Sequence, residues 1–136
     1  MRFARLIFRL GGIWGLIVMT PMYFMYDTIG RQYPPPITHP DMYYGFVSVT
    51  WVWQIAYVVI STDPVRFRPF MLVGILAKSL YFATMTAVYA SGGIQLSQLA
   101  AVIPDLVLAV LFAVSFVKTP RFWPASALTT AQVGSP

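Results

Sequence analysis

Cysteine is absent from this 136-residue sequence, and histidine occurs once, as His39. Without cysteine, disulfides, thiolate zinc or iron–sulfur sites and cysteine nucleophiles are excluded. A single histidine also excludes a multi-histidine haem or metal site within one chain. Charge is scarce, since only 10% of the residues are charged, while 58% are hydrophobic and the mean hydropathy is +0.70. This balance differs from that of soluble globular domains and predicts an integral membrane protein.

Four stretches approach the roughly 20 apolar residues that a spanning helix requires. They cover residues 10–26, 42–61, 69–90 and 99–117. The linkers between them are short, about 7 to 15 residues, so consecutive helices are expected to be antiparallel and adjacent. The expected fold is all-α, a four-helix transmembrane bundle over residues 1–124 that runs up-down-up-down. Residues 125–136 are expected to form a disordered cytoplasmic tail.

The basic residues are distributed unevenly between the two sides of this expected bundle. The net charge is +5, from nine basic and four acidic residues, and the side opposite the termini carries only Arg31. The termini side carries Arg2, Arg5, Arg9, Arg66, Arg68, Lys118 and Arg121. This positive-inside pattern predicts both termini in the cytoplasm. The basic residues therefore orient the chain, and nucleic-acid binding is not expected.

Small residues at a spacing of four indicate where helices pack closely in a membrane. Gly11 and Gly15 have this spacing in the first expected helix, and Ser79, Ala83 and Ala87 have it in the third. We interpret both sets as packing seams inside the bundle.

Proline occurs inside two of the expected helices, as Pro21 and Pro104. Each removes a backbone donor and favours a kink. Both lie in the outer half of the bundle, so that half is expected to be looser and able to hold a cavity.

The second expected helix carries its polar side chains along one stripe. Spacings of three and four residues align Tyr43, Val47, Thr50, Gln54, Tyr57 and Ser61. Polar groups avoid lipid, so Thr50, Gln54 and Tyr57 are expected to face the bundle interior.

Lys78 and Asp105 are ionisable residues inside apolar spans. A charge at mid-bilayer costs roughly 2.5 to 3.5 kcal/mol on insertion scales, which makes each residue a functional-site candidate. Their depths differ by about the length of a lysine side chain, so a direct ion pair is one alternative. Side chains tilt toward the N-terminus of their own helix, however, so Lys78 leans inward and Asp105 leans outward. We therefore favour two separate polar positions, with Lys78 snorkelling to the cytoplasmic interface and Asp105 the better site candidate.

The outer loop contains Asp27, His39 and Asp41. These residues suggest either a pH-sensitive or metal-binding cluster or a solvated loop, in which Thr38 or Asp41 caps the next helix. We favour the second interpretation, because one histidine and two carboxylates from a loop make a poor metal site.

The inner loop contains Asp63, Pro64, Arg66 and Arg68. Asp63 followed by proline is typical of a helix N-cap with proline at the first helical position. Arg66 is able to pair with Asp63 or with lipid phosphates, and we expect all three charged residues at the inner interface.

Residues 39–46 and 63–72, together with Lys78, resemble a family of small four-helix bacterial inner-membrane proteins. The resemblance covers most of the chain and implies the fold and the location but no activity. In that family an acidic residue precedes the lysine, where this chain has Ala77.

The helix count, with Asp27 ending the first helix and Gln54 inside the second, is similar to the emopamil-binding type of sterol- and drug-binding membrane protein. The pockets of that type use acidic residues in helices, and this chain has no carboxylate within its second span.

These features predict a small multi-pass membrane protein without a catalytic motif, metal or cofactor, in contact with membrane lipids. The leading hypothesis is an accessory subunit of a membrane complex or homo-oligomer, or a binder of a lipophilic molecule. One alternative is a lipid- or sterol-modifying enzyme with Asp105 as its acid or base. Another is a proton or ion pathway through Asp105, Gln54 and Lys78.

Overall fold

The computed structural model describes residues 2–33 and 35–121, and within these every regular element is a helix. The elements are α1 (Arg2–Met22), α2 (Tyr26–Gln32), α3 (Pro40–Thr62), α4 (Arg68–Ala90), α5 (Leu96–Ala100) and α6 (Ile103–Lys118). Helices α1, α3 and α4 are long and apolar enough to cross a membrane, as is the run Leu96–Lys118 that joins α5 and α6. The chain is therefore an all-helical, multi-pass membrane protein. The tail predicted at residues 125–136 lies outside the described residues.

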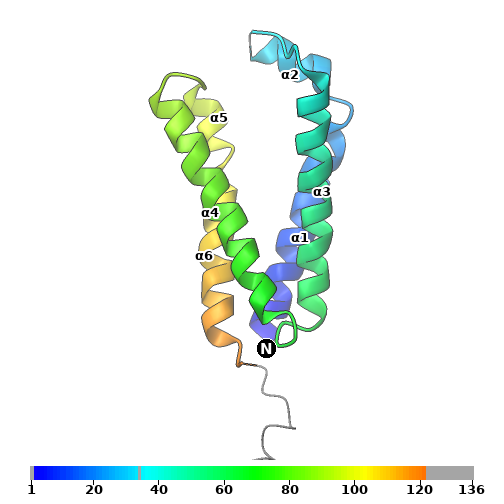
Figure 1. Ribbon diagram of the computed structural model, residues 1–136, viewed down its shortest axis with the longest axis vertical. Coiled ribbons are helices and arrows are strands. Elements are labelled where there is room, and N and C mark those ends of the chain that lie inside the picture. The colour runs from blue at the N-terminus through cyan, green and yellow to red at the C-terminus, as the bar shows by residue number, and fades with distance from the viewer. Residues whose placement is uncertain (1, 34, 122–136) are drawn as a thin grey trace, which may run out of the picture.

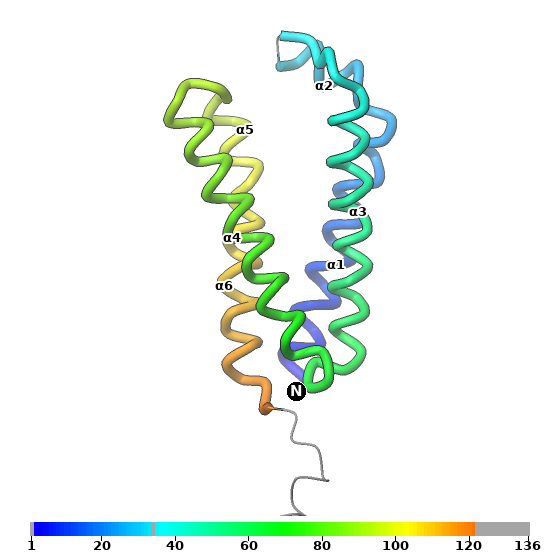
Figure 2. The backbone as a smooth tube through the Cα atoms, viewed as in Figure 1, coloured from blue at the N-terminus to red at the C-terminus, as the bar shows by residue number. Residues whose placement is uncertain are grey.

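The long helices are arranged as two pairs (Figure 1). Helix α1 packs along α3, and α4 packs along α6. The pairs meet at one end and diverge toward the other, which gives the backbone the outline of a V (Figure 2). We call the end with the start of α1, the α3–α4 loop and the end of α6 the closed end. The end with α2 and α5 is the open end.

Glycines in α1 allow the close contact between α1 and α3. A Cβ atom on Gly12 would lie 2.6 Å from the backbone oxygen of Gln54, and one on Gly15 would overlap the Gln54 side chain. Gly11 instead faces α6, where a Cβ would lie 3.1 Å from the ring of Phe112. The seam predicted at Gly11 and Gly15 is thus inside the bundle, although Gly12 is an essential part of it.

The prediction of a packing seam inside the bundle at Ser79, Ala83 and Ala87 is wrong, because all three residues are exposed. Helix α4 turns a different face inward, with Met71 and Gly74 buried. Gly74 lies against the aromatic rings of the core, so the bulk of those rings determines which face of α4 is covered.

The buried core lies toward the closed end. The ring of Phe8 stacks on that of Phe112 with centroids 4.0 Å apart, and Tyr57 packs edge-on against Phe112 at 5.0 Å. The core residues are Ala4, Phe8, Tyr57, Ile60, Met71 and Phe112. Because these residues come from α1, α3, α4 and α6, the core joins the two helix pairs where they meet.

Two helices differ from their predicted bounds. Helix α1 begins at Arg2 rather than near residue 10. The predicted start followed the apolar run, but the arginines before that run also adopt helical backbone. It ends at Met22, one residue after Pro21, and the separate helix α2 follows from Tyr26. The fourth span is interrupted between Ala100 and Ile103, directly before Pro104, which lacks the backbone donor needed to continue the ladder.

Candidate functional site

A cleft of about 460 Å³ lies between the two helix pairs. Most of its walls are apolar or aromatic, and its polar side chains include the intramembrane candidates from the sequence. It is lined by Trp14, Gly15, Val18, Met19, Met22, Tyr33, Phe46, Thr50, Trp53, Gln54, Tyr57, Ala77, Lys78, Tyr81, Gln98, Ala101, Val102, Pro104, Asp105 and Leu108. The volume and the composition are those of a small-molecule pocket.

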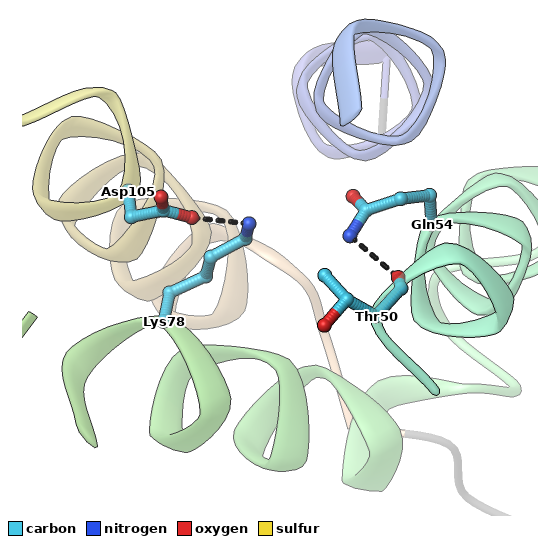
Figure 3. Close-up of polar contacts among 4 residues, drawn as sticks. All are labelled: Thr50, Gln54, Lys78 and Asp105. Atoms are coloured by element: carbon cyan, nitrogen blue, oxygen red, sulfur yellow. Dashed lines mark hydrogen bonds and ion pairs between the residues drawn. The ribbon is translucent and has the colours of Figure 1, made fainter. Parts of the chain in front are cut away.

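Lys78 and Asp105 form an ion pair at the wall of this cleft, through Nζ and Oδ1 (Figure 3). Their side chains are 12% and 21% exposed, so both are largely buried within the protein. The pair joins α4 to α6, and Lys78 Nζ also lies 5.6 Å from the centroid of the Tyr57 ring on α3. Among residues 2–33 and 35–121, it is the only salt bridge.

The expectation of two separate positions for Lys78 and Asp105 is therefore wrong. At about 1.5 Å per residue, Lys78 lies roughly 15 Å along α4 from Arg68, and Asp105 roughly 20 Å along α6 from Lys118. This difference of about 5 Å is within the reach of a lysine side chain. The tilt of the Cα–Cβ bond fixes only the first bond of the side chain, and the remaining rotatable bonds of lysine carry Nζ to the carboxylate.

Asp105 lies in the first turn of α6, because the fourth span is interrupted immediately before it. The partial positive charge of a helix N-terminus stabilises a carboxylate in this position. The helix end and Lys78 thus both present positive potential to the Asp105 carboxylate.

Gln54 and Thr50 face the ion pair from α3 (Figure 3). Gln54 is 2% exposed, and its Nε2 donates to the backbone oxygen of Thr50 at 2.9 Å. Its Oε1 lies against Gly15. Within the part of the chain that the structure describes, it is the one buried side-chain oxygen that has no hydrogen-bond partner. This oxygen is enclosed in the contact between α3 and α1, and leaving it unsatisfied costs roughly 1 to 3 kcal/mol.

The polar stripe predicted on the second span is directed inward. Gln54, Tyr57 and Ser61 are buried together with Val47, and Thr50 is half-buried. Periodicity thus predicts the orientation of α3, while the roles of Thr50, Gln54 and Tyr57 remain a prediction.

Several aromatic lining residues were not identified from the sequence. Tyr81 follows Lys78 by three residues, which places both on one face of α4. That spacing was a usable signal for Tyr81. Trp14 and Trp53 gave no comparable signal, because their exposure to the cleft depends on how the α1–α3 pair faces the α4–α6 pair.

The residues of the predicted outer loop do not come together in one site. Asp27 lies in the first turn of α2 and Asp41 in the first turn of α3, and both are exposed, as is His39. In the described part of the chain, no group of three histidine, cysteine or acidic residues is placed to hold a metal ion. The predicted capping by Thr38 or Asp41 is wrong, because His39 is the N-cap residue and no side chain bonds there.

Two residues of the predicted inner loop, Asp63 and Arg68, bond to backbone atoms at the closed end. Asp63 Oδ1 accepts from the backbone N of Arg66 at 3.2 Å and so shapes the loop. It does not cap α4, since Pro64 begins a separate turn and the N-cap residue of α4 is Phe67. Arg68 donates from Nε to the backbone oxygen of Thr119 at 2.9 Å, at the end of α6. This bond satisfies one of the carbonyls that a helix C-terminus leaves free.

The Arg68 guanidinium also lies 3.8 Å from the centroid of the Phe116 ring. Arg68 therefore connects the start of α4 to the end of α6.

Comparison with protein-family models, with curated proteins and with solved structures finds no match. The two family resemblances drawn from the sequence thus remain predictions, and the function has to be argued from the cleft itself.

Proposed function

We propose that this chain is a bacterial inner-membrane protein that binds a lipophilic molecule in the cleft between its helix pairs. Its helices would run up-down-up-down with both termini in the cytoplasm. The positive-inside rule supports this orientation, because Arg2, Arg68 and Lys118 lie at the closed end, whereas Arg31 lies on α2 at the open end. In this orientation the V of the two helix pairs opens toward the outer face (Figure 2).

The cleft carries the proposal. Its walls are mostly apolar and aromatic, which suits the body of a lipophile, while Gln54, Lys78 and Asp105 provide polar groups at one place. Burying an ion pair and an unsatisfied amide costs free energy. A binding role gives a physical reason for retaining these groups in so apolar a chain.

Two alternatives are less well supported by the geometry. An ion pathway needs a polar lining from one side to the other, but the cleft ends at the apolar core around Phe8, Tyr57 and Phe112. An enzyme that uses Asp105 as acid or base needs a carboxylate free to exchange a proton, and Asp105 is engaged by Lys78. If Asp105 is nevertheless the acid or base, Asp105→Asn should abolish turnover while leaving the fold intact.

An accessory-subunit role is compatible with lipid binding. The exposed face of α4 with Ser79, Ala83 and Ala87 would allow close approach of a helix from another subunit or a second copy. Native mass spectrometry reports such an assembly directly, as the mass of the intact complex.

Native mass spectrometry also tests the binding proposal. The protein would be reconstituted in nanodiscs of phosphatidylethanolamine and phosphatidylglycerol, and bound small molecules would be detected on its release. A matched pair of variants on α4 provides the control, because Ala77 lines the cleft and Ala83 is exposed outside it. We expect a bound lipophile on the wild type and on Ala83→Phe, and at least a roughly tenfold smaller bound fraction on Ala77→Phe. Equal occupancy of the two variants, or bare protein throughout, would contradict the proposal.

A further inference from the structure

We infer that the cleft selects an uncharged lipophile whose head carries a hydrogen-bonding oxygen, such as an alcohol or a ketone. This inference rests on the proposed function and specifies its ligand class. It follows from three features of the cleft: its two charged residues are paired, they keep hydrogen-bonding groups free, and the other walls are apolar and aromatic.

The charged lining residues of the cleft are Lys78 and Asp105, and they are paired with each other. The wall therefore has no net charge to offer. A cationic head would have to displace Lys78 from Asp105, and an anionic head would have to displace Asp105 from Lys78. Either displacement leaves one buried charge without its partner, which is a large penalty in a site of low polarity.

The same residues offer hydrogen bonds to an uncharged head. An ammonium group has three donors, of which Lys78 directs one at Asp105. Asp105 binds Lys78 through Oδ1, which leaves its second oxygen as an acceptor. Gln54 uses one of its two N–H donors on Thr50, while its oxygen is buried against Gly15 of α1 and is not offered to the cleft. A hydroxyl group can both donate and accept here, and a ketone can accept.

The remaining walls suit an apolar body. Trp14, Phe46, Trp53 and Tyr81 line the cleft from α1, α3 and α4. Aromatic rings offer large apolar area and provide no counter-charge for an anionic head. A polar head at the ion pair with its body among these rings would satisfy both parts of the lining.

A series of probes with one chain length tests the inference. Tritiated dodecan-1-ol, dodecanoate, dodecylamine and dodecylphosphocholine would be bound to the immobilised protein in mild detergent at pH 7.5. For each probe, binding to Ala77→Phe would be subtracted from binding to Ala83→Phe, so that only occupancy of the cleft is counted. We expect the alcohol to bind at least roughly tenfold more tightly than any of the charged or zwitterionic probes.

Charge variants provide a second readout. Lys78→Met leaves Asp105 unpaired and should shift the preference to dodecylamine, whereas Asp105→Asn leaves Lys78 unpaired and should shift it to dodecanoate. The double variant again has no net charge in the cleft and should regain the preference for dodecan-1-ol. If a single variant does not fold, the order of probe affinities on the protein without charge substitutions decides whether the inference holds.

The outcomes separate the two proposals. Cleft-dependent binding that is strongest for dodecanoate, dodecylamine or dodecylphosphocholine overturns the inference and leaves the proposed function standing. If none of the probes distinguishes Ala77→Phe from Ala83→Phe, and native mass spectrometry also finds no bound molecule, both fail together.

Discussion

Replacing Gly15 by alanine probes the contact that holds α1 against α3 at the cleft wall. The new Cβ would overlap Oε1 and Cδ of Gln54 and lie 2.7 Å from its Cγ. Gln54 is 2% exposed, so its side chain can relieve the overlap only by moving toward the cleft, which breaks its 2.9 Å bond to Thr50.

The magnitude follows from three contributions. Overpacking costs about 1 to 3 kcal/mol, and the lost hydrogen bond costs about 1 kcal/mol. Alanine in place of a helical glycine returns about 1 kcal/mol. We therefore expect Gly15→Ala to lower the free energy of unfolding by about 1 to 3 kcal/mol.

Gly12→Ala is a sharper perturbation of the same interface. Its Cβ would lie 2.6 Å from the backbone oxygen of Gln54, and backbone cannot swing aside as a side chain can. The two helices must separate, so the loss should be at or above the upper end of that range, about 3 kcal/mol. Gly45→Ala is the control, since a Cβ added there would meet no atom within 4 Å beyond its chain neighbours and its own helix backbone, and it should be neutral or stabilising.

The assay is unfolding in mixed micelles by titration with sodium dodecyl sulfate, followed by far-ultraviolet circular dichroism. The deciding measurement repeats both substitutions in a Gln54→Ala background, where the colliding side chain is gone but the backbone oxygen remains. The cost of Gly15→Ala should disappear there, and that of Gly12→Ala should persist. If Gly15→Ala costs as much in the Gln54→Ala background as it does with Gln54 in place, the packing argument is refuted.

The same titration tests two further contacts. Lys78→Met and Asp105→Asn should each lower the free energy of unfolding by about 2 to 3 kcal/mol, below the range for fully buried pairs because both side chains keep some exposure. Their double variant should recover part of the loss, and strictly additive losses would argue against the pair. Arg68→Met should cost about 1 to 2 kcal/mol through the lost contacts with Thr119 and Phe116. Arg68→Lys keeps the charge without the planar guanidinium and should recover less than half of that, so full recovery would contradict the role of the planar group.

The membrane spans and the orientation of α3 could be predicted from the sequence. Long apolar runs are a direct consequence of bilayer thickness, so they located α3 and α4 to within two residues. The inward stripe of α3 followed from helical periodicity, because Gln54 and Tyr57 avoid lipid wherever the neighbouring helices lie. Both inferences depend only on local sequence and on the solvent.

The ion pair and the cleft depend on tertiary arrangement and could not be predicted in the same way. Whether Lys78 meets Asp105 is decided by the rotation of α4 about its axis, which packing of Gly74 against the aromatic core determines. The width of the cleft depends on α1 pairing with α3 through Gly12 and Gly15. Proline predicted a kink near Pro104, but not that the fourth span would be interrupted there and that Asp105 would occupy the first turn of a new helix.

The backbones of α3 and α4 diverge along the V (Figure 1), and the cleft between the helix pairs lies among spans long and apolar enough to cross a membrane. A lipophile would therefore arrive by lateral diffusion within the bilayer, and its mole fraction among the lipids, rather than its aqueous concentration, would set occupancy. Transfer of a twelve-carbon chain from water into the bilayer lowers its free energy by roughly 9 kcal/mol, at about 0.8 kcal/mol per methylene group, before it reaches the protein. If the binding proposal holds, the protein would then contribute mainly the recognition of the head, and a handful of polar atoms would be enough to distinguish one membrane component from another.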